Sequence, residues 1–223
     1  MEKNNKEYEK KWKLYEKGED FSKDILREVI IKSDSEYSNL SNEEFISALI
    51  KDVTKNGGHQ HQRYLTEEQG LEMIQELNDD TPIPELDIDF EPSTFRIREE
   101  INDKGDLFYT VAIKGKDYEE VEAEYSFNKI ENYWENAVSG IKKIRLKVPF
   151  ENDLNLEIDY IPTLDLLLVE VEVNTEEELH NLPNFGEDVS EDEKYSIRIL
   201  SEFPILKEYL LLLDENESCD EQT

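Results

Sequence analysis

Seven segments of the sequence place charged residues at every second position, between apolar ones. Side chains two residues apart lie on the same face of a β-strand, so each segment predicts a strand with one charged face and one apolar face. The charged faces comprise Glu7, Glu9, Lys11 and Lys13; Arg96 and Arg98; Lys114; Glu120, Glu122 and Glu124; Lys143, Arg145 and Lys147; Glu157 and Asp159; and Glu170 and Glu172.

These charged faces allow two interpretations. A sheet that is half exposed to water shows the same alternation, with its charges simply solvated. Here, however, acidic strands are separated from basic ones, and like charges along one face repel each other unless something compensates them. A divalent cation compensates carboxylates, and a polyphosphate compensates arginine and lysine. Charged faces turned inward, beneath helices that cover the apolar faces, would bind both.

The net charge restricts the class of ligand. The chain of 223 residues has 56 acidic and 25 basic residues, for a formal charge of −31. Such a surface repels the phosphates of nucleic acid, so we expect it to attract metal cations or a basic partner instead. The only cysteine, Cys219, excludes an intrachain disulfide and favours a reducing compartment. No leader-like segment and no apolar run of roughly 20 residues occurs, so we expect a cytoplasmic protein without membrane contact.

The elements that must position the charges follow from periodicity and from helix caps. Consecutive strands joined by short turns predict an antiparallel sheet within an α+β fold, with a closed barrel as one possible arrangement. Capping boxes at Ser41/Glu44, Thr175/Glu178 and Ser190/Glu193 predict helix starts. The predicted strands are 6–15, 61–65, 94–101, 107–114, 121–127, 144–150, 155–161 and 165–173, and the predicted helices are 41–53, 66–77, 127–140, 175–182, 190–202 and 204–215.

Several of these segments resemble one family, the CYTH group of triphosphate tunnel metalloenzymes. The resemblance covers roughly residues 4–14 and 92–201, in the family's order, and is most specific from Glu157 to Leu200. The matching segments are EYEKKW, which fits the ExExK signature, followed by STFRIR, VAIKGK, EAEY, KIRLKVPF, EIDYI, LLLVEVEVNTEEEL and LPNFGEDVSEDEKYSIRIL.

The resemblance implies an eight-stranded antiparallel closed β-barrel with flanking helices, whose tunnel binds a triphosphate and one or two Mg²⁺ or Mn²⁺ ions. It implies a single domain over residues 1–210, with an irregular insertion at about 16–92 and an acidic tail at 211–223. It also implies three sets of site residues: catalytic Glu7, Glu9, Lys11, Glu170 and Glu172; metal-binding Glu7, Glu9, Glu122, Glu124, Asp159, Glu170 and Glu172; and substrate-binding Lys11, Arg96, Arg98, Lys114, Lys143, Arg145 and Lys194.

Three positions depart from the family pattern. Glu120 stands where an arginine is usual, which weakens phosphate binding or moves it, and Arg63 and Ile197 replace a glycine and an asparagine. His59 and His61 have too few neighbouring ligands for a transition-metal site, so we interpret them as polar loop residues.

We therefore expect a divalent-metal-dependent triphosphatase, acting on inorganic tripolyphosphate or on a small organic or nucleoside triphosphate, as a monomer or homodimer. Two alternatives stay open. One is a class IV-type adenylyl cyclase, and the other is a non-catalytic nucleotide binder or acidic decoy. A decoy would need outward acidic faces and would have no use for arginines on the strands.

Overall fold

The computed structural model describes residues 8–16, 29–30, 37–80, 92–101, 105–115, 120–150 and 154–202. Glu7, the predicted helix 204–215 and the acidic tail 211–223 lie outside these ranges. The strands are β1 (Tyr8–Glu16), β2 (Gly58–Leu65), β3 (Pro92–Ile101), β4 (Leu107–Gly115), β5 (Glu120–Glu124), β6 (Ser139–Pro149), β7 (Asn155–Ile161), β8 (Leu166–Val173) and β9 (Glu187–Asp188). The helices are α2 (Asn42–Asn56), α3 (Glu67–Asp80), α4 (Phe127–Glu135), α5 (Glu176–Asn181), the 3₁₀ turn η3 (Glu193–Tyr195) and α6 (Ile197–Leu200). None of the described helices is long and apolar enough to cross a membrane.

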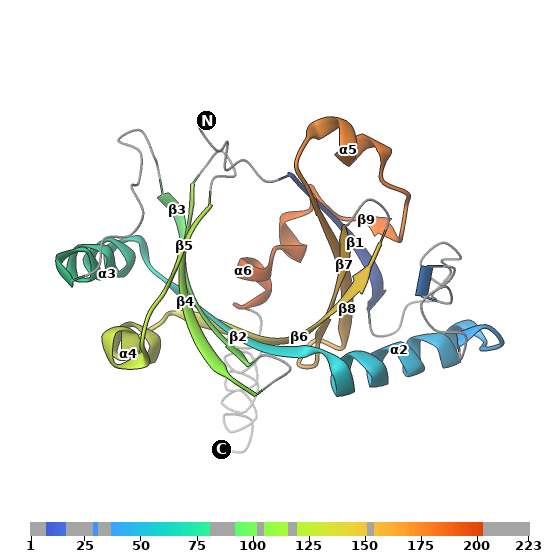
Figure 1. Ribbon diagram of the computed structural model, residues 1–223, viewed down its shortest axis with the longest axis horizontal. Coiled ribbons are helices and arrows are strands. Elements are labelled where there is room, and N and C mark those ends of the chain that lie inside the picture. Colours follow the sequence, from blue (N-terminus) through green and yellow to red (C-terminus); the bar gives the residue numbers. More distant parts are fainter. Residues whose placement is uncertain are drawn as a thin grey trace, which may run out of the picture.

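The described strands form one antiparallel sheet in the order β5-β4-β3-β2-β6-β7-β8-β1-β9. The sheet curves into an arc (Figure 1). β2 lies near its centre, between β3 and β6, although its sequence belongs to the segment 16–92 that we expected to be irregular. The prediction of an eight-stranded closed barrel is wrong: the sheet has nine strands, and the order of the described strands ends at β5 on one side and at β9 on the other.

The two edge strands explain why the sheet stays open. β5 has five residues and β9 has two, and short, charged edge strands are a common way to prevent further pairing. Both are acidic, since β5 reads EVEAE and β9 reads ED. A seam between them would bring carboxylates from both edges together, and opposed like charges destabilise a strand pair. The alternation of apolar and charged residues within a strand does not indicate whether two edge strands can pair with each other.

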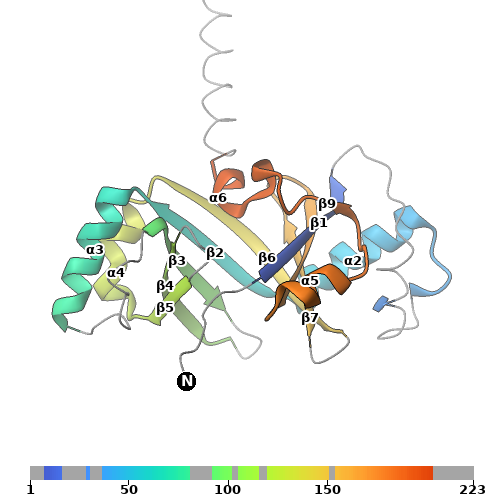
Figure 2. The same cartoon turned by 90° about the horizontal axis from the view of Figure 1, so that it is seen from above.

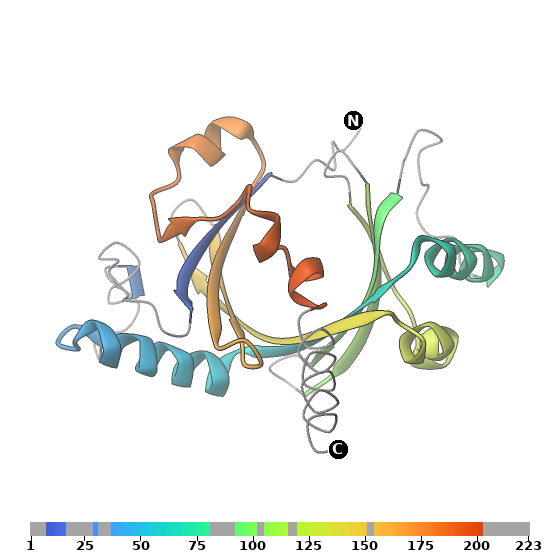
Figure 3. The ribbon, with the colours of Figure 1, turned by 180° about the vertical axis from the view of Figure 1, so that it is seen from behind.

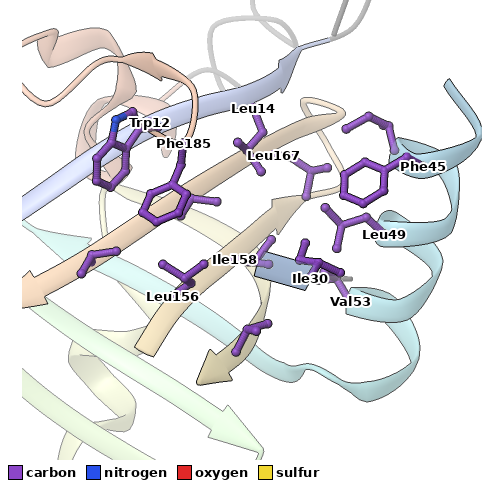
Figure 4. Packing of buried hydrophobic residues seen from close by; sticks show 14 of the residues in the cluster. Trp12, Leu14, Ile30, Phe45, Leu49, Val53, Leu156, Ile158, Leu167 and Phe185 are labelled. Atoms are coloured by element: carbon purple, nitrogen blue, oxygen red, sulfur yellow. The ribbon is translucent and has the colours of Figure 1, made fainter. Parts of the chain in front are cut away.

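The apolar faces of the strands point to the outside of the arc, as predicted. On one half of the sheet, α2 buries Phe45, Leu49 and Val53 in a core that contains Leu156 and Leu167 (Figure 4). On the other half, α3 and α4 cover a second core (Figures 1 and 2). A fully buried Leu, Val or Phe side chain contributes about 1.5–3 kcal/mol, so these cores fix the sheet and leave its inner face to the charges.

The C-terminal turns η3 and α6 lie inside the arc (Figures 1 and 3). Along the axis around which the sheet curves, they lie nearer to one of the two openings of the arc (Figure 2). Tyr195 and Leu200 pack there in a small core with residues of β2, β6 and β8. The prediction of one helix over 190–202 with a Ser190/Glu193 capping box is wrong. Asp192 accepts the hydrogen bond from the Lys194 backbone, and the Ser196 side chain caps a separate turn, so the helix begins twice. The capping boxes at Ser41/Glu44 and Thr175/Glu178 are confirmed.

Candidate functional site

The inner face of the sheet contains a cavity of about 870 Å³. Among the described residues, eight basic and seven acidic side chains line this cavity. In a chain of net charge −31, this is a strong local enrichment of cations. The lining residues are Glu9, Lys11, Gln62, Tyr64, Thr94, Arg96, Arg98, Lys114, Gly115, Glu120, Glu122, Lys143, Arg145, Lys147, Glu157, Glu170, Glu172, Glu193, Ser196, Ile197 and Arg198.

One half of the cavity rests on a buried ion-pair cluster, which we call the floor network. It consists of Lys11, Lys143, Arg145, Glu157, Asp159 and Glu170. Arg145 is at its centre: Nε lies 2.7 Å from Asp159 Oδ1, and Nη2 lies 2.6 Å from Asp159 Oδ2 and 2.5 Å from Glu170 Oε2. Arg145 also contacts Glu157, and Lys143 Nζ lies 2.5 Å from Asp159 Oδ2. This fork geometry fixes the carboxylates in one arrangement.

Burial and charge oppose each other in the floor network, and the balance differs between residues. Burial alone would raise the pKa of Glu170, but Lys11, Lys143 and Arg145 hold it well below its usual range. Burial alone would lower the pKa of Lys11, but Glu170 and Glu9 raise it above the ordinary value. Lys143 shows the opposite result, because burial and the neighbouring Arg145 lower its pKa despite Asp159. Glu170 and Lys11 are therefore both charged at neutral pH.

The opposite half of the cavity carries a second cluster, which we call the wall. It consists of Arg96 and Arg98 on β3, Lys114 on β4, and Glu120 and Glu122 on β5. Arg96 Nη2 lies 2.7 Å from Glu120 Oε1 and 2.9 Å from Glu122 Oε1, and Lys114 Nζ lies 3.1 Å from Glu120 Oε2. Arg98 also contacts Glu122. Burial lowers the pKa of Arg96, but Glu120 leads the charges that raise it above the ordinary value.

A row of uncharged polar side chains on β2 lies between the floor network and the wall. Tyr64 Oη donates a hydrogen bond to Gln62 Oε1 at 3.0 Å, and Gln60 Nε2 donates to Glu100 Oε2 at 3.1 Å. Burial raises the pKa of Tyr64 to about 12. These side chains therefore stay neutral at physiological pH and separate the two charged clusters.

Two carboxylates at the rim of the floor network are candidates for a metal ion. Glu9 on β1 and Glu172 on β8 are directly paired across the strands, and both line the cavity. Mg²⁺ prefers oxygen ligands and is often held by one or two carboxylates together with substrate phosphates and water. Among the described residues, no group of three or more Asp, Glu, His or Cys side chains is placed to hold a metal ion. Two carboxylates alone would hold such an ion only together with ligand oxygens and water.

The structure gathers most of the residues predicted for the site. Glu9, Lys11, Arg96, Arg98, Lys114, Lys143, Arg145, Glu122, Glu170 and Glu172 line the cavity, and Asp159 lies fully buried beneath it. Two predicted residues, Glu124 and Lys194, are not brought together with them, and Glu7 lies outside the described residues. Glu124 is not part of the lining. Lys194 is 60% exposed, lies 3.7 Å from Asp192 and does not line the cavity.

Arg198 is a basic lining residue that the predicted site residues do not include. It comes from α6 and is exposed. The other seven basic residues of the lining have carboxylate partners, whereas Arg198 has none within ion-pair distance among the described residues. No periodic pattern marks a single arginine in a short turn, so the sequence carried no signal for it.

A second hollow, of about 630 Å³, lies beside β1 and shares Glu9 with the first. Its lining includes Asp188, Glu191 and Asp192, with Lys10 as the one lysine or arginine among its described lining residues. Lys10 is already paired with Asp188 at 3.3 Å. This hollow therefore does not suit an anionic ligand.

Comparisons with known proteins give only distant likenesses. No protein-family model and no curated protein matches the sequence. Similar solved structures include the inorganic triphosphatase NE1496, with 18% identity, a TM-score of 0.44, and coverage of 87% of this chain and 93% of that one. PH1819 from Pyrococcus horikoshii is 16% identical, with a TM-score of 0.41 and coverage of 78% and 82%. A putative adenylyl cyclase from Hippeastrum, HpAC1, described as having dominant triphosphatase activity, is 11% identical, with a TM-score of 0.38 and the same coverage.

These likenesses are consistent with the CYTH resemblance of the sequence. Identities below 20% and TM-scores below 0.5 say nothing about chemistry, which depends on the side chains of the cavity.

Proposed function

We propose that the chain binds a small triphosphate in the cavity and hydrolyses one of its phosphoanhydride bonds with the help of a divalent metal ion. The observation that carries this proposal is the concentration of eight basic side chains in one cavity of a strongly acidic chain. Cations gathered against the net charge favour a compact polyanion, because local charge and hydrogen-bond donors act at short range.

Unused donors at the wall support an anionic ligand. Arg96 Nε and Arg98 Nε are buried and have no hydrogen-bond partner among the described residues. Buried donors without partners are uncommon and call for an explanation, such as a ligand that is absent. Arginine offers its donors in a planar fork that matches phosphate oxygens, so these two residues suit a phosphate group.

The size of the cavity favours a small molecule. Ligand cavities commonly measure about 300–1,000 Å³, and 870 Å³ lies within that range. A long nucleic acid would also have to approach an acidic exterior, which its phosphates oppose. Inorganic tripolyphosphate and small organic triphosphates satisfy both limits.

The chemistry follows from the placement of charges. In the proposed reaction, a water oxygen forms a bond to the terminal phosphorus while the anhydride P–O bond breaks. The leaving diphosphate takes the electron pair of that bond, and the water releases a proton. A Mg²⁺ or Mn²⁺ ion held by Glu9 and Glu172 would neutralise charge on the phosphate oxygens. Lys11, fixed by Glu9 at 3.2 Å and by Glu170 at 2.9 Å, lies where it can stabilise negative charge that develops on the phosphates.

The distribution of the cations favours this proposal over the decoy alternative. A decoy would present acidic residues outward and leave the cations scattered, whereas the sheet directs seven cations toward one cavity and α6 adds Arg198. No feature of the cavity favours a cyclase over a hydrolase, so the products decide between them.

The test is a phosphate-release assay with tripolyphosphate, ATP, GTP and thiamine triphosphate, each with Mg²⁺, with Mn²⁺ and with EDTA. We expect metal-dependent release of orthophosphate from at least one of them. Glu9→Gln keeps the side-chain volume but removes a metal ligand, and should lower kcat/KM by about a hundredfold or more. Glu131→Gln, on the exposed surface of α4, should leave turnover unchanged. Equal rates in the two variants, or release of cyclic AMP and pyrophosphate from ATP, would contradict the proposal.

A further inference from the structure

Strand β5 brings two carboxylates onto the cations of the wall. Glu120 is the direct cross-strand partner of Lys114, and Glu122 is the partner of Ala112, which itself pairs with Arg96. This register places Glu120 between Arg96 and Lys114, at 2.7 Å and 3.1 Å, and Glu122 between Arg96 and Arg98. Three cations of the cavity thus share two carboxylates of the same chain.

The ion pairs of the wall are partly accessible, and their exposure is uneven. The side chains of Lys114 and Glu122 are 43% and 40% exposed, whereas those of Arg96, Arg98 and Glu120 are 14%, 16% and 12% exposed. In the floor network, Lys143 and Asp159 are 3% and 0% exposed. Ion pairs open to solvent contribute little to folding, so the contacts of Lys114 and Glu122 add little to stability. A ligand that enters the cavity meets the cations that Glu120 and Glu122 contact, because all of these residues line it.

A phosphate and a carboxylate cannot both bind the same donors without cost. Both are acceptors for the same charge-assisted hydrogen bonds to arginine and lysine. They also repel each other, by about 1 kcal/mol per pair of charges at 4 Å in water and more at the lower effective dielectric of a cavity. A phosphate that binds the wall must therefore displace Glu120 and Glu122 from their cations or bind close to their charges.

We propose that Glu120 and Glu122 are built-in competitors of the ligand, which occupy the anion-binding groups of Arg96, Arg98 and Lys114 and so weaken the affinity of the cavity for polyphosphate. This inference rests on the proposed function, because it assumes that the wall receives a phosphate group. Glu120 is the stronger competitor of the two. Both engage two cations, but the Glu120 side chain is only 12% exposed, whereas that of Glu122 is 40% exposed and its charge is better screened by water.

The test measures tripolyphosphate binding by calorimetry, in EDTA so that metal-dependent turnover is absent. Glu120→Gln keeps the shape of the side chain and removes its charge, and should tighten binding by about tenfold, the effect of losing one repulsive charge at close range. Glu122→Gln should tighten binding less. The matched control is Glu99→Gln, on the same sheet but facing the outer side, where its carboxylate accepts a hydrogen bond from Tyr109. This control carries the same change in net charge and should leave the Kd within about twofold.

Four outcomes are informative. Tighter binding in the Glu120 variant but not in the Glu99 variant supports the competitor role. Equal changes in both would overturn it, since net charge alone would then explain the effect. Weaker binding in the Glu120 variant would also overturn it, because Glu120 would then position Arg96 for the ligand. Tighter binding together with no phosphate release by the wild-type protein would keep this inference and refute the proposed hydrolysis.

Discussion

The floor network and the wall are built from the same kinds of ion pair, but they differ in burial. In the floor network, Arg145 engages three carboxylates, and Asp159 beneath it is fully buried. In the wall, the partner Glu122 is 40% exposed. A buried charge that has no partner lowers the free energy of unfolding, because its desolvation is not compensated. An exposed ion pair contributes little to the free energy of unfolding. We therefore expect the floor network to stabilise the fold, and the cations of the wall to change partners when a ligand binds.

The largest expected effect comes from breaking the floor network. Arg145→Met keeps most of the side-chain length but leaves Glu157, Asp159 and Glu170 without their shared partner. We expect the free energy of unfolding to fall by about 3–5 kcal/mol, the usual loss when one member of a buried ion pair is removed. The matched change in the wall, Arg98→Met, should cost less than about 1 kcal/mol. Urea denaturation followed by circular dichroism measures the free energy of unfolding of both variants. Equal losses would show that the floor network and the wall contribute equally to stability.

The pH dependence of stability gives a second, smaller test. Lys11, Lys143 and Arg145 hold the pKa of Glu170 well below its unfolded value near 4.5, despite the opposing effect of burial. The resulting stability is fully present above about pH 4.5 and is lost as the pH falls through the folded pKa. The gap in unfolding free energy between the wild type and Glu170→Gln should therefore narrow below pH 4.5, by about 1.4 kcal/mol per pH unit.

Glu122→Gln provides the control for this titration, since its side chain belongs to the exposed wall. Its gap from the wild type should already be small at pH 7, under about 1 kcal/mol. Urea unfolding at pH 7, 5, 4 and 3 gives both gaps. A Glu170 gap that stays constant to pH 3 would mean that Glu170 is not held as an anion by the floor network.

Much of the fold and of the site followed from period-two alternation. The charged face of β8, which carries Glu170 and Glu172, and the apolar faces beneath α2 both lie where the pattern placed them. Two helix starts followed from capping boxes, because a serine or threonine and a glutamate three residues later satisfy each other's backbone groups. These features depend on residues close in sequence.

Sequence reasoning missed two kinds of feature. One depends on contacts between strands that are far apart in the sequence, and the other on which of several suitable residues caps a helix. Closure of the sheet depends on how two short acidic edges would meet, and alternation within a strand says nothing about that. At the C-terminal turns, Ser190, Asp192 and Ser196 are all suitable caps, and the structure uses the last two. The Ser190 side chain donates instead to Asp188, at 2.7 Å. The break between η3 and α6 leaves Arg198 in the cavity lining and Lys194 outside it.

The smallest expected effect separates these two cations. Arg198 lines the cavity and has no ion-pair partner among the described residues, so removing it should cost no folding free energy. Arg198→Ala should nevertheless weaken tripolyphosphate binding by about fivefold, which corresponds to roughly 1 kcal/mol for an exposed charge pair. Lys194→Ala removes the same charge four residues earlier, from a side chain that lies over Tyr195 and outside the cavity. It should change the Kd by less than twofold, and the difference between the variants should shrink at 1 M salt, where the screening length falls to about 3 Å. If both variants weaken binding equally, the ligand senses only the net charge of the C-terminal turns, and the cavity has no role for Arg198.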